Sequence, residues 1–69
     1  MPFANLKVPA GTLTADQKER MITTVTDLYA DVYGEQARPN TLVLVDEVVD
    51  GGWGIGGNVL TTAMLNPKH

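Results

Sequence analysis

With 69 residues, of which 43% are hydrophobic, the chain is predicted to form a single domain, residues 1–69, whose small core needs self-association for stability. The absence of cysteine excludes disulfides and thiolate metal sites, and the lone histidine, His69, excludes a clustered-imidazole site, so no metal is expected. A net charge of −3 argues against a nucleic-acid partner, and the lack of a long apolar run or a signal sequence argues against a membrane, which predicts a cytoplasmic protein.

The first expected element is a strand at residues 3–8, where apolar and polar side chains alternate imperfectly. Met1 and Pro2 stand directly before it. An initiator Met before Pro is normally removed, which would leave Pro2 with a free secondary amine. The pKa of an α-amino group is ordinarily about 7.7 to 8.0, and a desolvated pocket lowers it. Pro2 is therefore a candidate base, although many proteins begin Met-Pro without any such chemistry.

The next expected element is a helix over residues 14–33. Thr14 and Gln17 have the spacing of a capping box, which indicates the start of the helix. Gly34 stands where a left-handed C-cap is expected. The apolar face of this helix is formed by Met21, Ile22, Val25, Leu28, Tyr29 and Val32.

A second strand is expected at residues 41–45, after a loop at 35–39. Its unbroken apolar run is typical of a parallel strand that is buried on both faces. Strand, helix and strand form a β-α-β unit with a right-handed crossover. Two strands and one helix leave an apolar sheet face or edge for a partner subunit. Asp46 and Glu47, just after the strand, could do acid-base chemistry, but the solvated end of a strand is the more common reason for such a pair.

A glycine-rich tract follows at residues 49–57. Its segment GWGIGG formally matches the dinucleotide fingerprint, but that motif needs a following helix and an acidic residue about 20 positions on. The 12 residues after Gly57 contain no acidic residue, so the tract is interpreted as a hairpin or bulge. Trp53 within it could belong to the core, a subunit interface or a pocket wall. Residues 58–65 are expected to form a further short strand or hairpin, and the chain from Pro67 onward is expected to be frayed.

Pro2 before a strand, the capped helix, the apolar second strand and the sequence WGIGG at 53–57 together resemble the 4-oxalocrotonate tautomerase family, over about residues 2–61. The resemblance implies an α+β fold: a small β-α-β subunit with a parallel two-stranded sheet, one long helix and a C-terminal glycine-rich hairpin. It further implies a homohexamer, a trimer of dimers, in which an N-terminal proline is the general base and each active site draws residues from neighbouring subunits.

Only some of the functional residues of the family have a match in this sequence. Pro2 matches the catalytic proline, and Trp53 falls where the founding enzyme has a phenylalanine that forms an apolar pocket wall. Of the family's two arginines, which bind the carboxylates of a dicarboxylate substrate, one is replaced by Thr12 or Leu13. The other falls on Leu42.

The loss of these arginines affects the expected substrate more than the fold. The nearest arginine is Arg38, in the loop before the second strand, and Lys7 lies on the first strand. A keto-enol acid with one carboxylate, such as an aryl pyruvate, met by Arg38 or Lys7, therefore fits better than a dicarboxylate.

The resemblance implies a cofactor-independent isomerase that catalyses keto-enol tautomerisation, a 1,3- or 1,5-proton transfer, of a small 2-keto or 2-hydroxy-enoate acid. Candidate donors to the enolate are the backbone amides of residues 6–8, Lys7, or Arg38 of a neighbour. Two alternatives stay open: an altered or inactive subunit of an oligomeric assembly, and a hydratase- or dehalogenase-like relative. The intact mass of the protein distinguishes the active enzyme from the inactive subunit, because it shows whether Met1 is removed. A retained Met1 blocks the amine of Pro2 and favours the inactive subunit.

Overall fold

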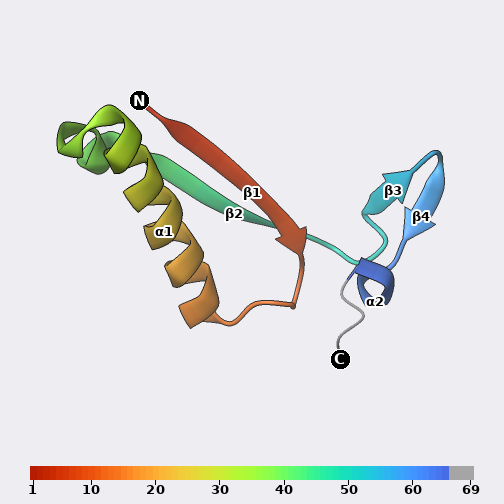
Figure 1. Cartoon of the computed structure of the whole chain (residues 1–69). Coiled ribbons are helices and arrows are strands. Elements are labelled where there is room, and N and C mark those ends of the chain that lie inside the picture. Colours follow the sequence, from red (N-terminus) through yellow and green to blue (C-terminus); the bar gives the residue numbers. More distant parts are fainter. Residues whose placement is uncertain (66–69) are drawn as a thin grey trace.

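A computed structural model describes residues 1–65, which form a β-α-β unit followed by a hairpin (Figure 1). Its main elements are β1 (Phe3–Pro9), α1 (Ala15–Tyr33), η1 (Glu35–Asn40), β2 (Leu42–Val48), β3 (Trp53–Ile55) and β4 (Asn58–Leu60). The fraying expected from Pro67 onward, and His69, lie outside the described residues. The small β-α-β fold predicted from the sequence is confirmed.

β1 and β2 form a parallel two-stranded sheet, in register from the pair Phe3 and Leu42 to the pair Pro9 and Val48. β2 is longer than the predicted strand at 41–45, because it includes Asp46 and Glu47. The polarity of these carboxylates predicts that the strand ends before them. They are accommodated within it because lysines distant in the sequence pair with them.

α1 begins at the predicted capping box. The backbone N–H of Gln17 donates to Oγ1 of Thr14 at 3.1 Å, and the N–H of Thr14 donates to Oε1 of Gln17 at 2.8 Å. The helix ends at Gly34, whose N–H donates to the Ala30 carbonyl at 2.8 Å. Gly34 has φ 104° and ψ 158°, a conformation that favours glycine but is not the predicted left-handed helical one.

The segment that follows α1 differs from the prediction. A 3₁₀ helix, η1, occupies the segment that was expected to be a loop, and it contains Pro39. The side chain of Gln36 folds over Gly34. Because this flexible side chain could move aside for a Cβ, the positive φ is the feature of Gly34 that favours glycine.

α1 covers one face of the sheet and leaves the other open (Figure 1). On the open face Phe3 is 52% exposed, Leu42 46% and Leu44 44%. The predicted burial of the second strand on both faces is therefore wrong for the single chain, since one helix can cover only one side. The prediction of an apolar sheet face left without cover agrees with this arrangement.

The apolar face of α1 is wider than the sheet it packs on. Ile22, Leu28 and Val32 belong to the predicted face but are exposed, because two strands offer only a narrow surface. Among the residues whose side chains the structure describes, Ala30, at 3% exposed, is the one hydrophobic residue that is buried. The single chain thus has a thin core.

The glycine-rich tract forms the predicted hairpin. β3 pairs antiparallel with β4, and Gly56 and Gly57 between them have φ of 59° and 84°. Positive φ at both central residues is typical of a type I′ turn, whose twist suits a two-residue hairpin. A one-turn helix, α2 (Thr62–Leu65), follows, where a strand or hairpin was expected. Within residues 1–65 no helix is long and apolar enough to cross a membrane.

Candidate active site

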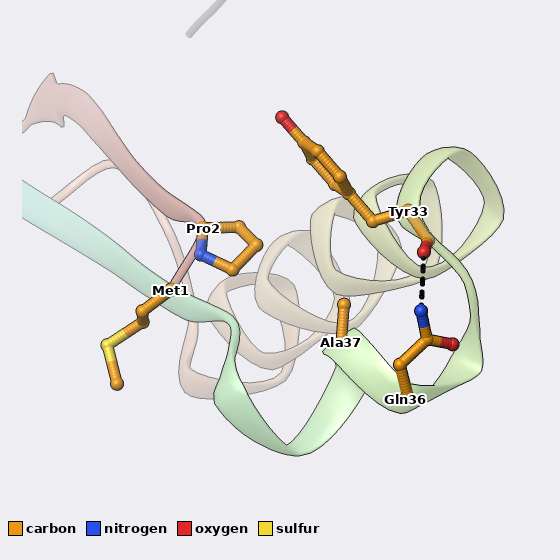
Figure 2. A pocket seen from close by; sticks show the side chains of 5 residues that line it. All are labelled: Met1, Pro2, Tyr33, Gln36 and Ala37. Carbon is orange, nitrogen blue, oxygen red and sulfur yellow. Dashed lines mark hydrogen bonds between the residues drawn. The ribbon is translucent and has the colours of Figure 1, made fainter.

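Pro2 lies at the amino end of the sheet, beside the carboxyl end of α1. Its carbonyl accepts a hydrogen bond from the N–H of Leu42 at 2.9 Å, which fixes it against β2. A cavity of about 400 Å³ opens next to it, a volume within the usual range for small-molecule sites (Figure 2). The cavity is lined by Met1, Pro2, Tyr33, Gln36 and Ala37.

The topology explains why these residues meet. A β-α-β crossover returns the chain to the amino end of the parallel sheet, so the end of α1 and η1 must come beside the start of β1. No sequence motif marks Tyr33, Gln36 or Ala37 as site residues. They could have been inferred from their position between the predicted helix and the second strand, because the topology brings that segment beside Pro2.

Met1 determines the chemical state of Pro2. While Met1 is attached, the nitrogen of Pro2 belongs to an amide and is not a base. The side chain of Met1 is 88% exposed and also lines the cavity. Removal of Met1 would therefore convert the nitrogen to a secondary amine and also enlarge the space in front of it.

Arg38 follows directly after the cavity residue Ala37, but its guanidinium group is engaged within the chain. Nε and Nη2 donate to the carboxylate of Glu35 at 3.0 and 3.1 Å, and Nη1 donates to Asp27 at 2.6 Å. The hydrogen bonds from Arg38 lower the pKa of the Glu35 carboxyl, since they stabilise its charged form. Arg38 could bind a substrate carboxylate only in competition with these two side chains.

Lys7 and Leu42 lie on the open face of the sheet, not in the cavity of their own chain. Lys7 forms an ion pair with Asp46 across the strands, and both groups are about half exposed. Leu42 contacts the site through its backbone N–H, while its side chain is on the same face as Phe3.

Trp53 lies beyond the opposite end of the sheet from Pro2 (Figure 1). Seven-residue strands at about 3.3 Å per residue separate the two ends by roughly 20 Å. The side chain is half-buried beside Leu60, and its indole Nε1 is buried without a hydrogen-bond partner in residues 1–65. One chain therefore does not bring Pro2 and Trp53 together.

A second hollow, of about 530 Å³, lies between β1 and the first half of α1. It is lined mainly by apolar side chains, among them Leu6, Leu13 and Met21, and Arg20 is its one charged residue. The cavity at Pro2 is smaller, but it contains the group that can become a base. Among the described residues no cluster of His, Asp or Glu side chains is arranged to hold a metal ion.

Comparisons with known proteins agree with this architecture. The model of a family described as tautomerase enzyme matches residues 2–63. A probable tautomerase, K2, of Dickeya dadantii (strain 3937) is 41% identical over 61 residues, which cover 88% of this chain and 90% of that protein.

Solved structures give the same result. A structure from a study of 4-oxalocrotonate tautomerase isozymes of Methylibium petroleiphilum superposes with a TM-score of 0.73 at 31% identity, covering 94% of this chain and 98% of that one. DmpI of Helicobacter pylori superposes with a TM-score of 0.72 at 33% identity, covering 99% of this chain and all of that one. The chain belongs to the tautomerase family, and it is an isomerase of the tautomerase class.

Proposed function

We propose that Pro2, freed by removal of Met1, is the general base of a tautomerase that acts on a small 2-keto or 2-hydroxy-enoate acid. The observation that supports this most is the cavity at Pro2, in a chain of this family that offers no cysteine, serine or internal histidine for other chemistry. General acid-base catalysis of this kind contributes about 10² to 10⁴ in rate.

The proposed reaction moves one proton and needs no other reactant. The nitrogen of Pro2 takes the proton of the substrate's 2-hydroxyl group, and the electrons left on oxygen form the C2 carbonyl. The electron pair of the C2–C3 double bond takes a proton from the prolinium at C3. In a dienol the C2–C3 pair can instead form a C3–C4 double bond, and the C4–C5 pair then takes the proton at C5. Pro2 returns to its neutral state at the end of the cycle.

The remaining site residues are proposed to act across subunits in a homohexamer. Leu42 lies on the open face of the sheet and Trp53 lies beyond the opposite end of the sheet from Pro2, and both would form apolar walls for a neighbour. Arg38, which follows the cavity residue Ala37, or Lys7 of a neighbour would meet the single carboxylate of the substrate. The open sheet face and the unmet indole N–H of Trp53 support an assembly, because buried donors normally find an acceptor.

The test is ketonisation of phenylenolpyruvate, followed by ultraviolet absorbance, with the intact mass of the purified protein measured first. We expect a mass that lacks Met1, and a loss of about 10² or more in kcat/KM for a form with one additional residue ahead of Pro2, which turns the amine into an amide. Pro2→Ala should also lose activity, although it keeps a primary amine.

Pro9→Ala is the matched control, because Pro9 lies at the far end of β1, outside the cavity. It should retain wild-type activity. Equal rates for the wild type and the N-terminally extended form would rule out Pro2 as the base. A retained Met1 together with no activity above the uncatalysed rate would instead support the alternative of an inactive assembly subunit.

A further inference from the structure

The cavity at Pro2 has one flat wall, the phenol ring of Tyr33, the last residue of α1. Figure 2 shows this ring extending from the helix on the side where Pro2 lies, with its hydroxyl at the far tip. The Tyr33 side chain is 59% exposed, and no hydrogen bond to its hydroxyl occurs among residues 1–65. The apolar face of the ring is thus available for contact.

The ring of Tyr33 is held in place by its neighbours. It stacks on Tyr29, one helical turn earlier, with centroids 6.1 Å apart and an angle of 18° between the planes. The backbone beside it is anchored by Gln36, whose Nε2 donates to the carbonyl of Tyr33 at 2.9 Å. A wall that is already ordered loses little conformational entropy when a ligand packs on it.

The rest of the cavity offers little to a charged group. Once Met1 has been removed, Ala37 contributes aliphatic carbon, and the amide of Gln36 is turned back onto the helix end. No charged side chain is among the lining residues. The cavity of one chain therefore favours a flat, apolar part of a substrate over a second carboxylate.

From this arrangement we infer that Tyr33 is a specificity-determining residue, which selects acids with an aryl or other flat conjugated group at C3 by packing its ring against that group. The inference rests on the proposed role of Pro2, which acts on the adjacent carbon. The role belongs to the ring and not to the hydroxyl, so Tyr33→Phe should behave as the wild type.

The catalytic test compares phenylpyruvate with 2-ketobutyrate, which keeps the keto acid but replaces the phenyl group by methyl. Deuterium exchange at C3 in D₂O, followed by NMR, reports proton transfer for both compounds. Tyr33→Ala should lower kcat/KM for phenylpyruvate about tenfold, mainly through KM, and for 2-ketobutyrate less than twofold. Tyr33→Leu should show the same selective loss, because it keeps apolar bulk without a flat ring.

A binding measurement keeps the inference separate from the proposed role of Pro2. Cinnamate and crotonate differ in the same way, phenyl against methyl, and neither can tautomerise. Tyr33→Ala should raise the dissociation constant of cinnamate about tenfold, or about 1.4 kcal/mol, and leave that of crotonate unchanged. This result is expected even if the N-terminally extended form proves as active as the wild type.

Val32→Ala is the control for truncation at the end of α1, since Val32 is 68% exposed and does not line the cavity. It should leave both binding and exchange unchanged. An equal loss for the aryl and methyl compounds in Tyr33→Leu, or a loss in Tyr33→Phe, would overturn the inference. So would unchanged binding of cinnamate by Tyr33→Ala, with the activity of Pro2 intact.

Discussion

Glu47 on β2 connects two segments that are distant from it in the sequence. Its Oε2 accepts a hydrogen bond from Nζ of Lys18 on α1 at 2.7 Å, and its Oε1 accepts one from the N–H of Gly11 at 3.4 Å. These contacts attach the start of the helix and the loop before it to the sheet. The hydrogen bond from Lys18, followed by that from Gly11, lowers the pKa of the Glu47 carboxyl below its ordinary value of 4.5.

This lowered pKa makes part of the stability depend on pH. Because the folded-state pKa lies below the unfolded value, the stabilisation is fully present above about pH 4.5 and is lost as pH falls through the folded pKa. Glu47→Gln should lower the midpoint of thermal unfolding at pH 7, and the difference from wild type should shrink at pH 3. Thermal unfolding followed by circular dichroism at the two pH values measures this difference.

The matched control for this prediction is Glu19→Gln. The structure shows no ion pair for Glu19 among the described residues, so the substitution should change the midpoint little at either pH. A difference between Glu47→Gln and wild type that is the same at pH 3 and pH 7 would mean that the charge of Glu47 is not the cause.

At the scale of elements, the parts predicted best are those whose signals are local. The capping box of α1 depends on residues close together in the sequence and was found as predicted. The glycine-rich tract forms a hairpin, one of the two structures predicted for it. η1 and the end of β2 were missed. The sequence predicts a loop at 35–39, whereas a 3₁₀ helix occupies this segment and contains Pro39. Asp46 and Glu47 stay in the strand because lysines far away in the sequence pair with them.

The capping box leads to a prediction about α1. Thr14→Ala removes the acceptor for the N–H of Gln17 and should destabilise the protein by about 1 kcal/mol, measured by urea unfolding. Thr23→Ala makes the same chemical change at an exposed position inside the helix. Alanine has the higher helix propensity there, so stability should be unchanged or slightly higher. Equal destabilisation by both substitutions would contradict the role of the cap.

At the scale of the whole molecule, the single chain is elongated and thinly packed. Its radius of gyration is 14.7 Å, whereas a compact chain of this length has about 11 Å. The hairpin extends beyond the end of the sheet, and the open sheet face exposes Phe3, Leu42 and Leu44 (Figure 1). An exposed apolar face of this kind is typical of a surface that is covered in an assembly.

The open sheet face leads to a prediction about assembly. Leu44→Lys places a charge at the centre of that face and should produce smaller species than wild type in sedimentation velocity, because burying an unpaired charge is costly. Val32→Lys puts the same charge on the outer side of α1, where the side chain is 68% exposed, and should leave assembly unchanged. The opposite pattern would place the interface on the helix.

The sequence by itself determined the family, the β-α-β order with its parallel strands, the start of α1, the hairpin and Pro2 as the candidate base, since each depends on neighbouring residues or on a pattern that survives without contacts. Only the tertiary structure decided what surrounds Pro2. It brought Tyr33, Gln36 and Ala37 to the cavity, engaged Arg38 with Glu35 and Asp27, and placed Trp53 at the opposite end of the sheet. These are contacts between elements that are distant in the sequence. Which residues meet depends on the three-dimensional path of the chain, and the spacing of residues in the sequence does not reveal it.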